Sequence, residues 1–301
     1  MNAGVKVLEV ERSGTGGGSG RSLLVFTDMD GSLLDHHDYS FGPARPLLEL
    51  LEAAGIPLIP NTSKTRAELE SLRRAVGSRH PFIVENGAAV FIPRGYFARQ
   101  PAATRAMQDY WVYEFSGPRQ GWLDTLAALE TEFSGEFTSF HREGVDGVMA
   151  LTGLERADAA LANQREYSEP VSWLGGAERK AEFIQALRQR GANPLQGGRF
   201  LTLAGNCDKG RAMQWLRNAY RDAGFPAPIH SIAIGDSGND VAMLEAAETA
   251  LVVRSPVHGF PKLERREKTI YSTGYGPAGW AEGVSQWLQA MGVRNAQTEE
   301  R

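Results

Sequence analysis

Residues 23–31 read LLVFTDMDG, a short apolar run that ends in two aspartates and a glycine. The run has the length and composition of a buried strand, and aspartates at i and i+2 can aim both carboxylates into one site. A second apolar run at 232–234 ends in GDSGND at 235–240. Because the carboxyl ends of strands in an open parallel sheet meet at one crevice, the two acidic motifs predict a shared site.

The composition bounds the class of protein. The chain has 301 residues, of which 42% are hydrophobic and 23% charged, enough for a large core or two domains. The net charge of −4, without a basic block, makes nucleic acid an unexpected partner. The lone Cys207 cannot form an internal disulfide, and no apolar stretch reaches the ~18 residues of a membrane span. We therefore expect a cytoplasmic protein without a membrane partner, whose oligomeric state stays open.

Short apolar segments alternate with helical patterns before residue 93 and after residue 199. This alternation predicts an α/β fold with a Rossmann-like, mostly parallel sheet. Strands are predicted at 23–27, 56–60, 81–84, 229–234 and 249–253, and helices at 46–54, 66–76, 211–223, 241–247 and 278–290. The Asn-Gly pair at 86–87 predicts a turn, from which a hairpin can start with 88–92.

The middle region, 93–199, is richer in aromatic residues and predicts an inserted α/β cap domain. The predicted core is then 21–92 and 200–294, with the chain returning to it at a strand over 199–203. Inside the cap we predict helices at 122–133, 156–164 and 178–190, and strands at 148–151 and 170–173. Glycine and serine dominate the first twenty residues, which predicts a disordered extension over 1–20, and 295–301 is predicted to be a tail.

Asp28 and Asp30 are the candidate catalytic carboxylates. One can attack phosphorus and form an aspartyl-phosphate, while the other protonates the departing alkoxide. The alternative is an Asp-Gly turn with a helix-capping aspartate.

A magnesium site is predicted at the same place, since Mg²⁺ prefers hard oxygen ligands and needs only one or two carboxylates beside phosphate and water. Asp28, the backbone carbonyl of Asp30, and Asp236 can supply three oxygens. Asn239 and Asp240 either ligate the ion or hold its ligands. Asp240 can also be a helix N-terminal acid that the macrodipole favours.

A phosphoryl group needs donors and a positive charge as well. Thr62 follows the predicted strand 56–60 and can donate its hydroxyl and backbone N–H to a phosphate oxygen. Lys209 supplies a compact cation for the same oxygens. The alternatives are a helix N-cap for Thr62 and a surface position for Lys209.

Four motifs together carry a resemblance: FTDMDGSLL at 26–34, NTSKT at 61–65, DKG at 208–210 and GDSGND at 235–240. They are similar to the four motifs of the haloacid dehalogenase-like phosphatases. This resemblance implies Asp28 as nucleophile, Asp30 as general acid and base, Thr62 and Lys209 as phosphate holders, and Asp236 with Mg²⁺.

More narrowly, NTSKT, VENGA at 84–88, REYSEP at 165–170 and GGRFL at 197–201 resemble segments of the mannosyl-3-phosphoglycerate phosphatases. That family implies a small sugar-linked phosphoglycerate as substrate and mannosylglycerate as product. The alternatives are another sugar-phosphate phosphatase, acting on glucosyl-3-phosphoglycerate or sucrose phosphate, a phosphomutase, or a non-catalytic sugar-phosphate sensor.

Such a substrate needs donors for a carboxylate and acceptors for sugar hydroxyls. For Lys64 and Arg165 the alternative is a solvated helix charge, and for Glu169 it is an ordinary acidic residue in a loop. The candidate substrate-binding residues are Ser63, Lys64, Asn86, Arg165, Glu169 and Arg199.

Overall fold

A computed structural model describes residues 20–197 and 199–293. The predicted extension 1–20, apart from Gly20, and the predicted tail 295–301 lie outside the described residues. Within the described part of the chain, no helix has the length and apolar character needed to cross a bilayer.

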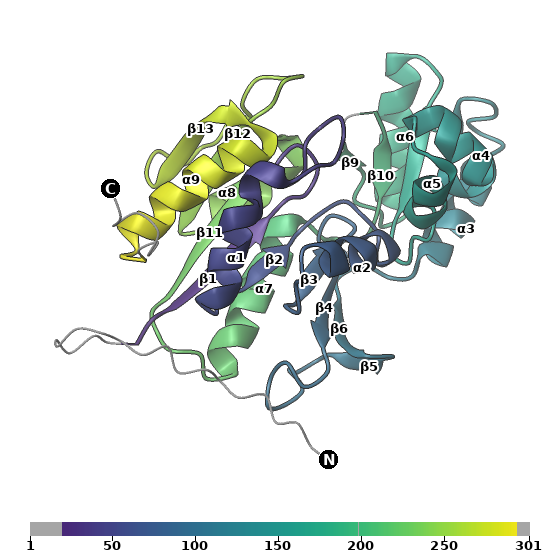
Figure 1. Cartoon of the computed structure of the whole chain (residues 1–301). Coiled ribbons are helices and arrows are strands. Elements are labelled where there is room, and N and C mark those ends of the chain that lie inside the picture. The colour runs from purple at the N-terminus through teal and green to yellow at the C-terminus, as the bar shows by residue number, and fades with distance from the viewer. Residues whose placement is uncertain (1–19, 198, 294–301) are drawn as a thin grey trace, which may run out of the picture.

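A five-stranded parallel sheet forms the centre of the core, in the order β13-β12-β11-β1-β2 (Figure 1). The strands are β1 (Ser22–Thr27), β2 (Leu58–Pro60), β11 (Ile229–Gly235), β12 (Thr249–Arg254) and β13 (Thr269–Tyr275). The predicted Rossmann-like arrangement is confirmed, with strands from both ends of the sequence as neighbours. The edge strand β13 was not predicted.

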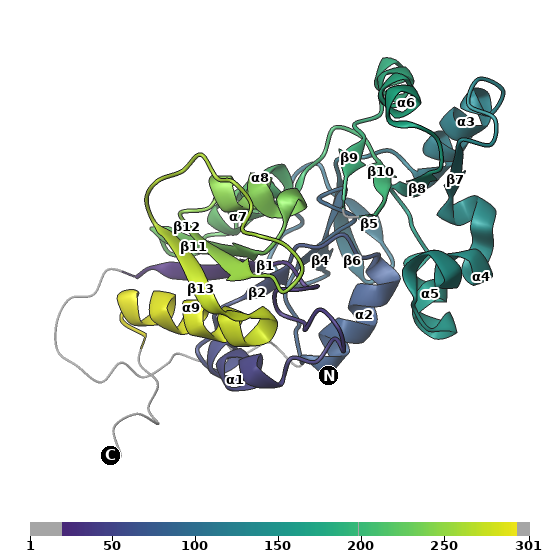
Figure 2. The same cartoon turned by 90° about the horizontal axis from the view of Figure 1, so that it is seen from above.

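Helices cover both faces of this sheet, as the view from above shows (Figure 2). Leu23 and Val25 of β1 pack with α1 and α9 on one face, and Leu24 and Phe26 pack with α7 and α8 on the other. The side chains of a strand alternate between faces, so one strand supplies both cores. The core helices are η1 (Gly42–Ala44), α1 (Arg45–Ala53), α2 (Arg66–Ala75), α7 (Lys209–Asp222), η2 (Gly238–Asp240), α8 (Val241–Ala246) and α9 (Gly276–Ala290).

A second, antiparallel sheet has the order β3-β4-β6-β5. It consists of β3 (Phe82–Val84), β4 (Ala89–Pro93), β5 (Arg105–Met107) and β6 (Tyr110–Glu114). The predicted hairpin between β3 and β4 is confirmed, and three of the four residues that join its strands, Glu85, Asn86 and Gly87, have positive φ. A Cβ at Gly87 would lie 2.2 Å from the carbonyl oxygen of Asp208, so glycine lets this turn pack against the start of α7.

The cap contains a third sheet, antiparallel, in the order β7-β8-β10-β9. Its strands are β7 (Phe137–Ser139), β8 (Glu169–Trp173), β9 (Leu195–Gln196) and β10 (Leu201–Leu203), and its helices are α3 (Arg119–Leu129), α4 (Phe140–Thr152), α5 (Arg156–Ala162) and α6 (Ala177–Gln189). β10 was expected to return to the core but pairs with β8 and β9. At the other end of the predicted cap, β5 and β6 fall within 93–199 but form one sheet with β3 and β4 of the core. We therefore propose that the cap runs from the start of α3 through Leu203.

The strand predicted at 148–151 is wrong, because these residues belong to α4. Ser139 caps this helix through its hydroxyl, which accepts a hydrogen bond from the N–H of Arg142. The buried Val148 packs with Phe140 and with Ala159 of α5. Packing between helices thus decides the conformation of a short apolar run that could also form a strand.

Candidate active site

Two neighbouring strands deliver the acidic motifs to one place. Asp28 follows β1 and Asp236 follows β11, which pair in parallel with Thr27 opposite Ile234. The backbone N–H of Asp28 donates to the carbonyl of Ile234 at 2.8 Å. One carboxylate oxygen from each of Asp28, Asp236 and Asp240 lies within 4.8 Å of the other two. The sheet topology therefore brings these three predicted residues into one buried cluster.

Lys209 lies inside this cluster. Its Nζ is 2.7 Å from Oδ1 of Asp28 and 2.6 Å from Oδ1 of Asp240, and its side chain is fully buried. Burial disfavours the ammonium, but the two carboxylates outweigh burial, so the pKa of Lys209 lies above its ordinary value. Asn61, at the end of β2, donates to the backbone carbonyl of Lys209 at 2.9 Å and so fixes the start of α7.

The cluster holds three carboxylates against one ammonium. Burial and the charge of Asp240 raise the pKa of Asp28 well above its ordinary value, although Lys209 opposes them. Burial and Asp240 raise the pKa of Asp236 to about 7. The cluster thus has an excess of buried negative charge that a cation would relieve.

The donor set fits a hard divalent cation. Oδ1 of Asp30 is buried and has no hydrogen-bond partner within 20–197 and 199–293, which leaves an oxygen without a donor beside the cluster. A Cβ at Gly31, where φ is +74°, would lie 2.7 Å from Oδ2 of Asp236. Glycine therefore keeps this approach to the carboxylate open.

The loop after β11 is held by its own side chains. Oδ2 of Asp240 accepts the backbone N–H of Asp236 at 3.1 Å and that of Ser237 at 3.0 Å. Asn239 accepts the Ser237 hydroxyl at 2.5 Å and donates to Oδ1 of Asn86 at 3.0 Å. Asn86, predicted to contact substrate, is thus joined to the loop that carries Asp236.

The predicted phosphate loop follows β2. Thr62 is buried, and its hydroxyl oxygen accepts the backbone N–H of Lys64 at 3.2 Å. Nζ of Lys64 lies 2.9 Å from Oδ2 of Asp30 and 3.7 Å from Glu68, and it lies 5.1 Å from the ring centroid of Tyr39. Burial opposes the charge of Lys64, but Asp30 and Glu68 raise its pKa above the ordinary value.

A cavity of about 230 Å³ lies between the core and the cap. The core lines it with Asp30, Ser63 and Lys64, and the cap with Arg165 and with Arg199 from the loop before β10. The cavity therefore combines the predicted proton-transfer residue with four of the six predicted substrate residues.

Arg199 is fixed by two carbonyls at the end of α4. Its guanidinium donates to the carbonyl of Leu151 at 2.9 Å and to that of Thr152 at 3.0 Å. Because these bonds cross from the loop before β10 to α4, they hold Arg199 at the cap side of the cavity.

The remaining predicted residue, Glu169, is engaged within the cap. Its Oε2 accepts from Nε of Arg119 at 2.5 Å, and its Oε1 accepts the backbone N–H of His141 at 2.7 Å. Arg119 also donates to the carbonyl and the side-chain oxygen of Asn163. Glu169 is fully buried, so this ion pair links β8 to the start of α3 and to the end of α5.

Sequence reasoning missed several residues of this site. Tyr39 lines the cavity, Asn61 fixes Lys209, and Nε2 of His258, from the loop after β12, lies 3.4 Å from Oδ2 of Asp236. Asn61 and Glu85 were quoted only as parts of motifs, and Glu85 is completely buried beside Arg165. The available signal for Glu85 was a charged residue between two apolar strands.

The comparisons with known proteins agree with this geometry. The family model of sucrose-6F-phosphate phosphohydrolase matches residues 160–288. A glucosyl-3-phosphoglycerate/mannosyl-3-phosphoglycerate phosphatase from Methanococcoides burtonii is 36% identical over 87% of this chain and 95% of its own length. A protein of the same name from Persephonella marina is 31% identical over 89% of this chain and 98% of its own length.

Solved structures share the fold at lower identity. A phosphatase of the HAD superfamily from Bacteroides thetaiotaomicron has a TM-score of 0.62 at 17% identity, over 94% of this chain and all of that one. The sucrose-phosphatase from Synechocystis sp. PCC6803 has a TM-score of 0.53 at 14% identity, over 89% of this chain and 98% of that one. The chain belongs to the haloacid dehalogenase-like phosphatases and is closely related to the glucosyl-3-phosphoglycerate/mannosyl-3-phosphoglycerate phosphatases.

Proposed function

We propose that this phosphatase hydrolyses a glycosyl-3-phosphoglycerate, with mannosyl-3-phosphoglycerate as the leading substrate, through an aspartyl-phosphate on Asp28 and with Mg²⁺ as cofactor. The observation that carries the reaction type is the contact between the buried Lys209 and Asp28, 2.7 Å from Nζ to Oδ1. A buried carboxylate beside a fixed ammonium and a second acidic strand end is suited to attack on a phosphate monoester.

Asp28 acts as the nucleophile in this proposal. Lys209 holds Oδ1, and no described residue donates a hydrogen bond to Oδ2. That free oxygen attacks phosphorus and forms the aspartyl-phosphate as the bond to the leaving alkoxide breaks. The ammonium of Lys209 and the hydroxyl of Thr62 orient the phosphoryl oxygens and stabilise their charge.

Asp30 moves the protons. It lines the cavity two residues after Asp28 and is held by Lys64 through its Oδ2. In the first step it gives a proton to the departing alkoxide, and in the second it takes one from the water that hydrolyses the aspartyl-phosphate.

The residues for the cofactor are Asp28, the backbone carbonyl of Asp30, and Asp236, with Asp240 holding their loop. When bound there, Mg²⁺ supplies positive charge that neutralises the phosphoryl oxygens and offsets the crowded carboxylates. Asp240 is already bonded to Lys209 and to two backbone N–H groups, so its role in the proposal is to position Asp236.

The substrate assignment rests on the named relatives and on the charges around the cavity. Lys64, Arg165 and Arg199 place three cations around a space of about 230 Å³. A glycerate carboxylate next to a phosphate needs such donors, and Ser63 adds a hydroxyl for the sugar.

A phosphate-release screen tests the function. The enzyme is incubated in Mg²⁺ with mannosyl-3-phosphoglycerate, glucosyl-3-phosphoglycerate, sucrose phosphate and simple sugar monophosphates, with and without a sugar bisphosphate primer. We expect the highest kcat/KM for one of the two glycosyl-3-phosphoglycerates, with free phosphate as product. Isomerised sugar phosphate that depends on the primer would instead identify a phosphomutase. If no ester is turned over, the result would support a non-catalytic sugar-phosphate sensor.

A further inference from the structure

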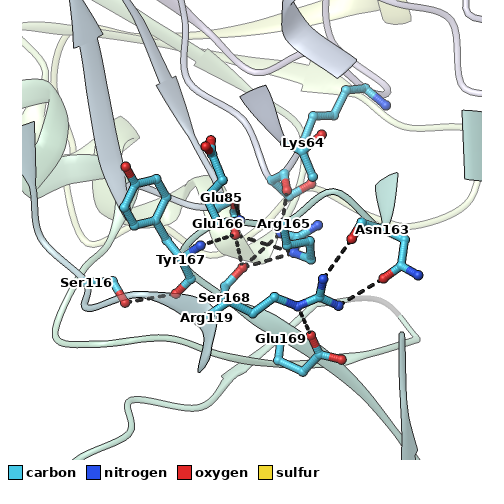
Figure 3. A network of polar contacts seen from close by, with 12 residues as sticks. Lys64, Glu85, Ser116, Arg119, Asn163, Arg165, Glu166, Tyr167, Ser168 and Glu169 are labelled. Carbon is cyan, nitrogen blue, oxygen red and sulfur yellow. Dashed lines mark hydrogen bonds and ion pairs between the residues drawn. The ribbon is translucent and has the colours of Figure 1, made fainter. Parts of the chain in front are cut away.

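Glu85 is a buried carboxylate of the core that binds a segment of the cap (Figure 3). Its side chain is fully buried in the turn between β3 and β4. Oε1 accepts the backbone N–H of Glu166 at 2.8 Å, and Oε2 accepts that of Tyr167 at 3.2 Å and the hydroxyl of Ser168 at 2.6 Å. A buried carboxylate with three donors from one short segment is a strong and specific contact.

The bound segment lies at the connections between core and cap. Ser116 lies in the first connection, which joins β6 to α3, and its hydroxyl donates to the carbonyl of Tyr167 at 2.9 Å. Gly205 lies in the second connection, which joins β10 to α7, and its N–H donates to the same hydroxyl oxygen at 2.9 Å. Figure 3 shows Ser116 and Tyr167 next to the Glu85 contact. The cap segment 166–168 is therefore the place where both connections and the core turn meet.

Ser168 also connects Glu85 to Arg165, which lines the cavity. Because Ser168 gives its one hydroxyl proton to Glu85, its oxygen accepts from Nε and Nη2 of Arg165 at 3.1 and 3.0 Å. Nη2 also donates to the carbonyl of Ser63 at 3.0 Å. No described residue accepts a hydrogen bond from Nη1, and Arg165 lines the cavity. Glu85 thus holds Arg165 with one side of its guanidinium available to a ligand.

On its other side, the turn of Glu85 supports the phosphate site. The backbone N–H of Glu85 donates to the carbonyl of Lys64 at 3.0 Å, and that of Asn86 donates to the carbonyl of Thr62 at 2.9 Å. Gly87 packs against the backbone of Asp208 and Lys209. One turn therefore contacts the loop of Thr62, the start of α7 and the cap.

The backbone of this turn is also constrained. Glu85 has φ of +50°, a conformation that non-glycine residues rarely adopt, which requires support from the surrounding contacts.

We propose that Glu85 is a positioning residue that sets the cap over the core and fixes Arg165 at the cavity, so that it controls the hydrolysis of phosphate esters large enough to reach the cap. This role rests on the proposed phosphatase function. Small esters, which contact only the core, do not depend on it. Glu85 touches neither substrate nor the reacting atoms and acts through Ser168 and Arg165.

Glu85→Gln tests the proposal with two substrates. The variant keeps the size of the side chain but loses the charge and an acceptor oxygen, so the Ser168 and backbone bonds compete for the single remaining oxygen. For mannosyl-3-phosphoglycerate we expect kcat/KM to fall at least about tenfold, mainly through KM, which corresponds to about 1.4 kcal/mol. For p-nitrophenyl phosphate we expect kcat/KM within about twofold of the wild-type value.

Two further variants sharpen the comparison. Ser168→Ala removes the link to Arg165 but leaves both backbone donors to Glu85, and it should show the same loss with the large substrate only. Glu248→Gln is the control, because Glu248 also joins two side chains, His230 and Lys268, far from the cap. Glu248→Gln should keep the wild-type kcat/KM for both esters.

Amide hydrogen exchange separates this proposal from the proposed function. In Glu85→Gln the amides of Glu166 and Tyr167 should exchange at least about tenfold faster than in wild type, a larger change than at the amides of β1, which lie away from this contact. Equal losses of kcat/KM for both esters, no loss for either, or unchanged exchange at these amides would overturn the proposal. A wild-type enzyme inactive on both esters would contradict the proposed function, while the exchange measurement would still decide the role of Glu85.

Discussion

Nζ of Lys64 lies 2.9 Å from Oδ2 of Asp30, and both residues line the cavity between core and cap. The side chain of Lys64 is 12% exposed and that of Asp30 39% exposed, so the lysine holds a carboxylate that still reaches the cavity. Lys64 was predicted as a substrate contact, and its position adds a second task, the orientation of the residue that we propose for proton transfer.

Removing this ammonium should slow turnover without unfolding the chain. In Lys64→Met we expect kcat/KM to fall at least about tenfold, because positioned acid–base groups typically contribute about 10²–10⁴-fold and Asp30 loses its partner. Steady-state kinetics with a glycosyl-3-phosphoglycerate measures the loss, and circular dichroism checks the fold.

Lys268→Met is the matched control for that variant. Lys268 also pairs with a carboxylate, Glu248 at 3.0 Å, but on the exposed edge of the sheet. It should keep the wild-type kcat/KM. A Lys64→Met enzyme as active as this control would contradict the assigned role of Lys64.

The pair of Arg119 and Glu169 should contribute strongly to the stability of the cap. Among the described residues, Arg119→Met leaves the fully buried Glu169 with only the N–H of His141 as donor, and breaking such a pair typically costs about 3–5 kcal/mol. The exposed pair of Arg105 and Glu114 provides the comparison, for which Arg105→Met should cost about 0–1 kcal/mol. Denaturant unfolding measures both, and equal losses would show that Glu169 is not held by Arg119.

The metal-free protein should become more stable when Asp236 loses its charge. Its pKa is about 7 in the folded chain against an ordinary 3.8, so between these values the folded state binds a proton that the unfolded state does not. The free energy of unfolding therefore falls as pH rises through this window. In chelator at pH 8, Asp236→Asn should unfold at a higher temperature than wild type, by about 2–4 °C for each kcal/mol. The difference in unfolding temperature between variant and wild type should vanish near pH 4. A lower unfolding temperature for the variant at pH 8 would contradict the claim that the charge of Asp236 destabilises the metal-free cluster.

In Mg²⁺, wild type should unfold at a higher temperature than Asp236→Asn. A ligand at a hundredfold excess over its Kd adds about 2.7 kcal/mol to the stability of a chain that binds it only when folded. The free energy of unfolding of wild type should rise by this amount in Mg²⁺, and that of Asp236→Asn should rise much less. Thermal unfolding measures both. Chelator should abolish phosphate release by wild type and Mg²⁺ should restore it; activity that persists in chelator would exclude the metal from the mechanism.

The parallel core was predictable because local patterns specify it. Apolar runs such as 23–27 and 232–234 end at carboxylates, and the topology of a parallel sheet then places Asp28 beside Asp236. The run 148–151 was mistaken for a strand because a short apolar run fits either conformation, and packing on Phe140 and α5 decided it. The edge strand β13 carries mixed polar and apolar residues that predict no strand by themselves.

The contacts between core and cap could not be read from the sequence. Glu85 and Ser168 lie far apart in the chain, and only the folded arrangement brings their side chains to 2.6 Å. For the same reason, the pairing of Lys64 with Asp30 and of Glu169 with Arg119 was not foreseen, although Lys64, Asp30 and Glu169 were each predicted as site residues.

The most direct test of the proposed mechanism is mass spectrometry of the enzyme quenched in acid during turnover of mannosyl-3-phosphoglycerate in Mg²⁺. We predict one phosphoryl group on the peptide that contains Asp28, and none in Asp28→Asn, which should keep its fold but lose at least about 10³-fold in kcat, because removal of a nucleophile that acts as part of a unit costs at least this much. A phosphoryl group on another residue, or full turnover by Asp28→Asn, would contradict the account.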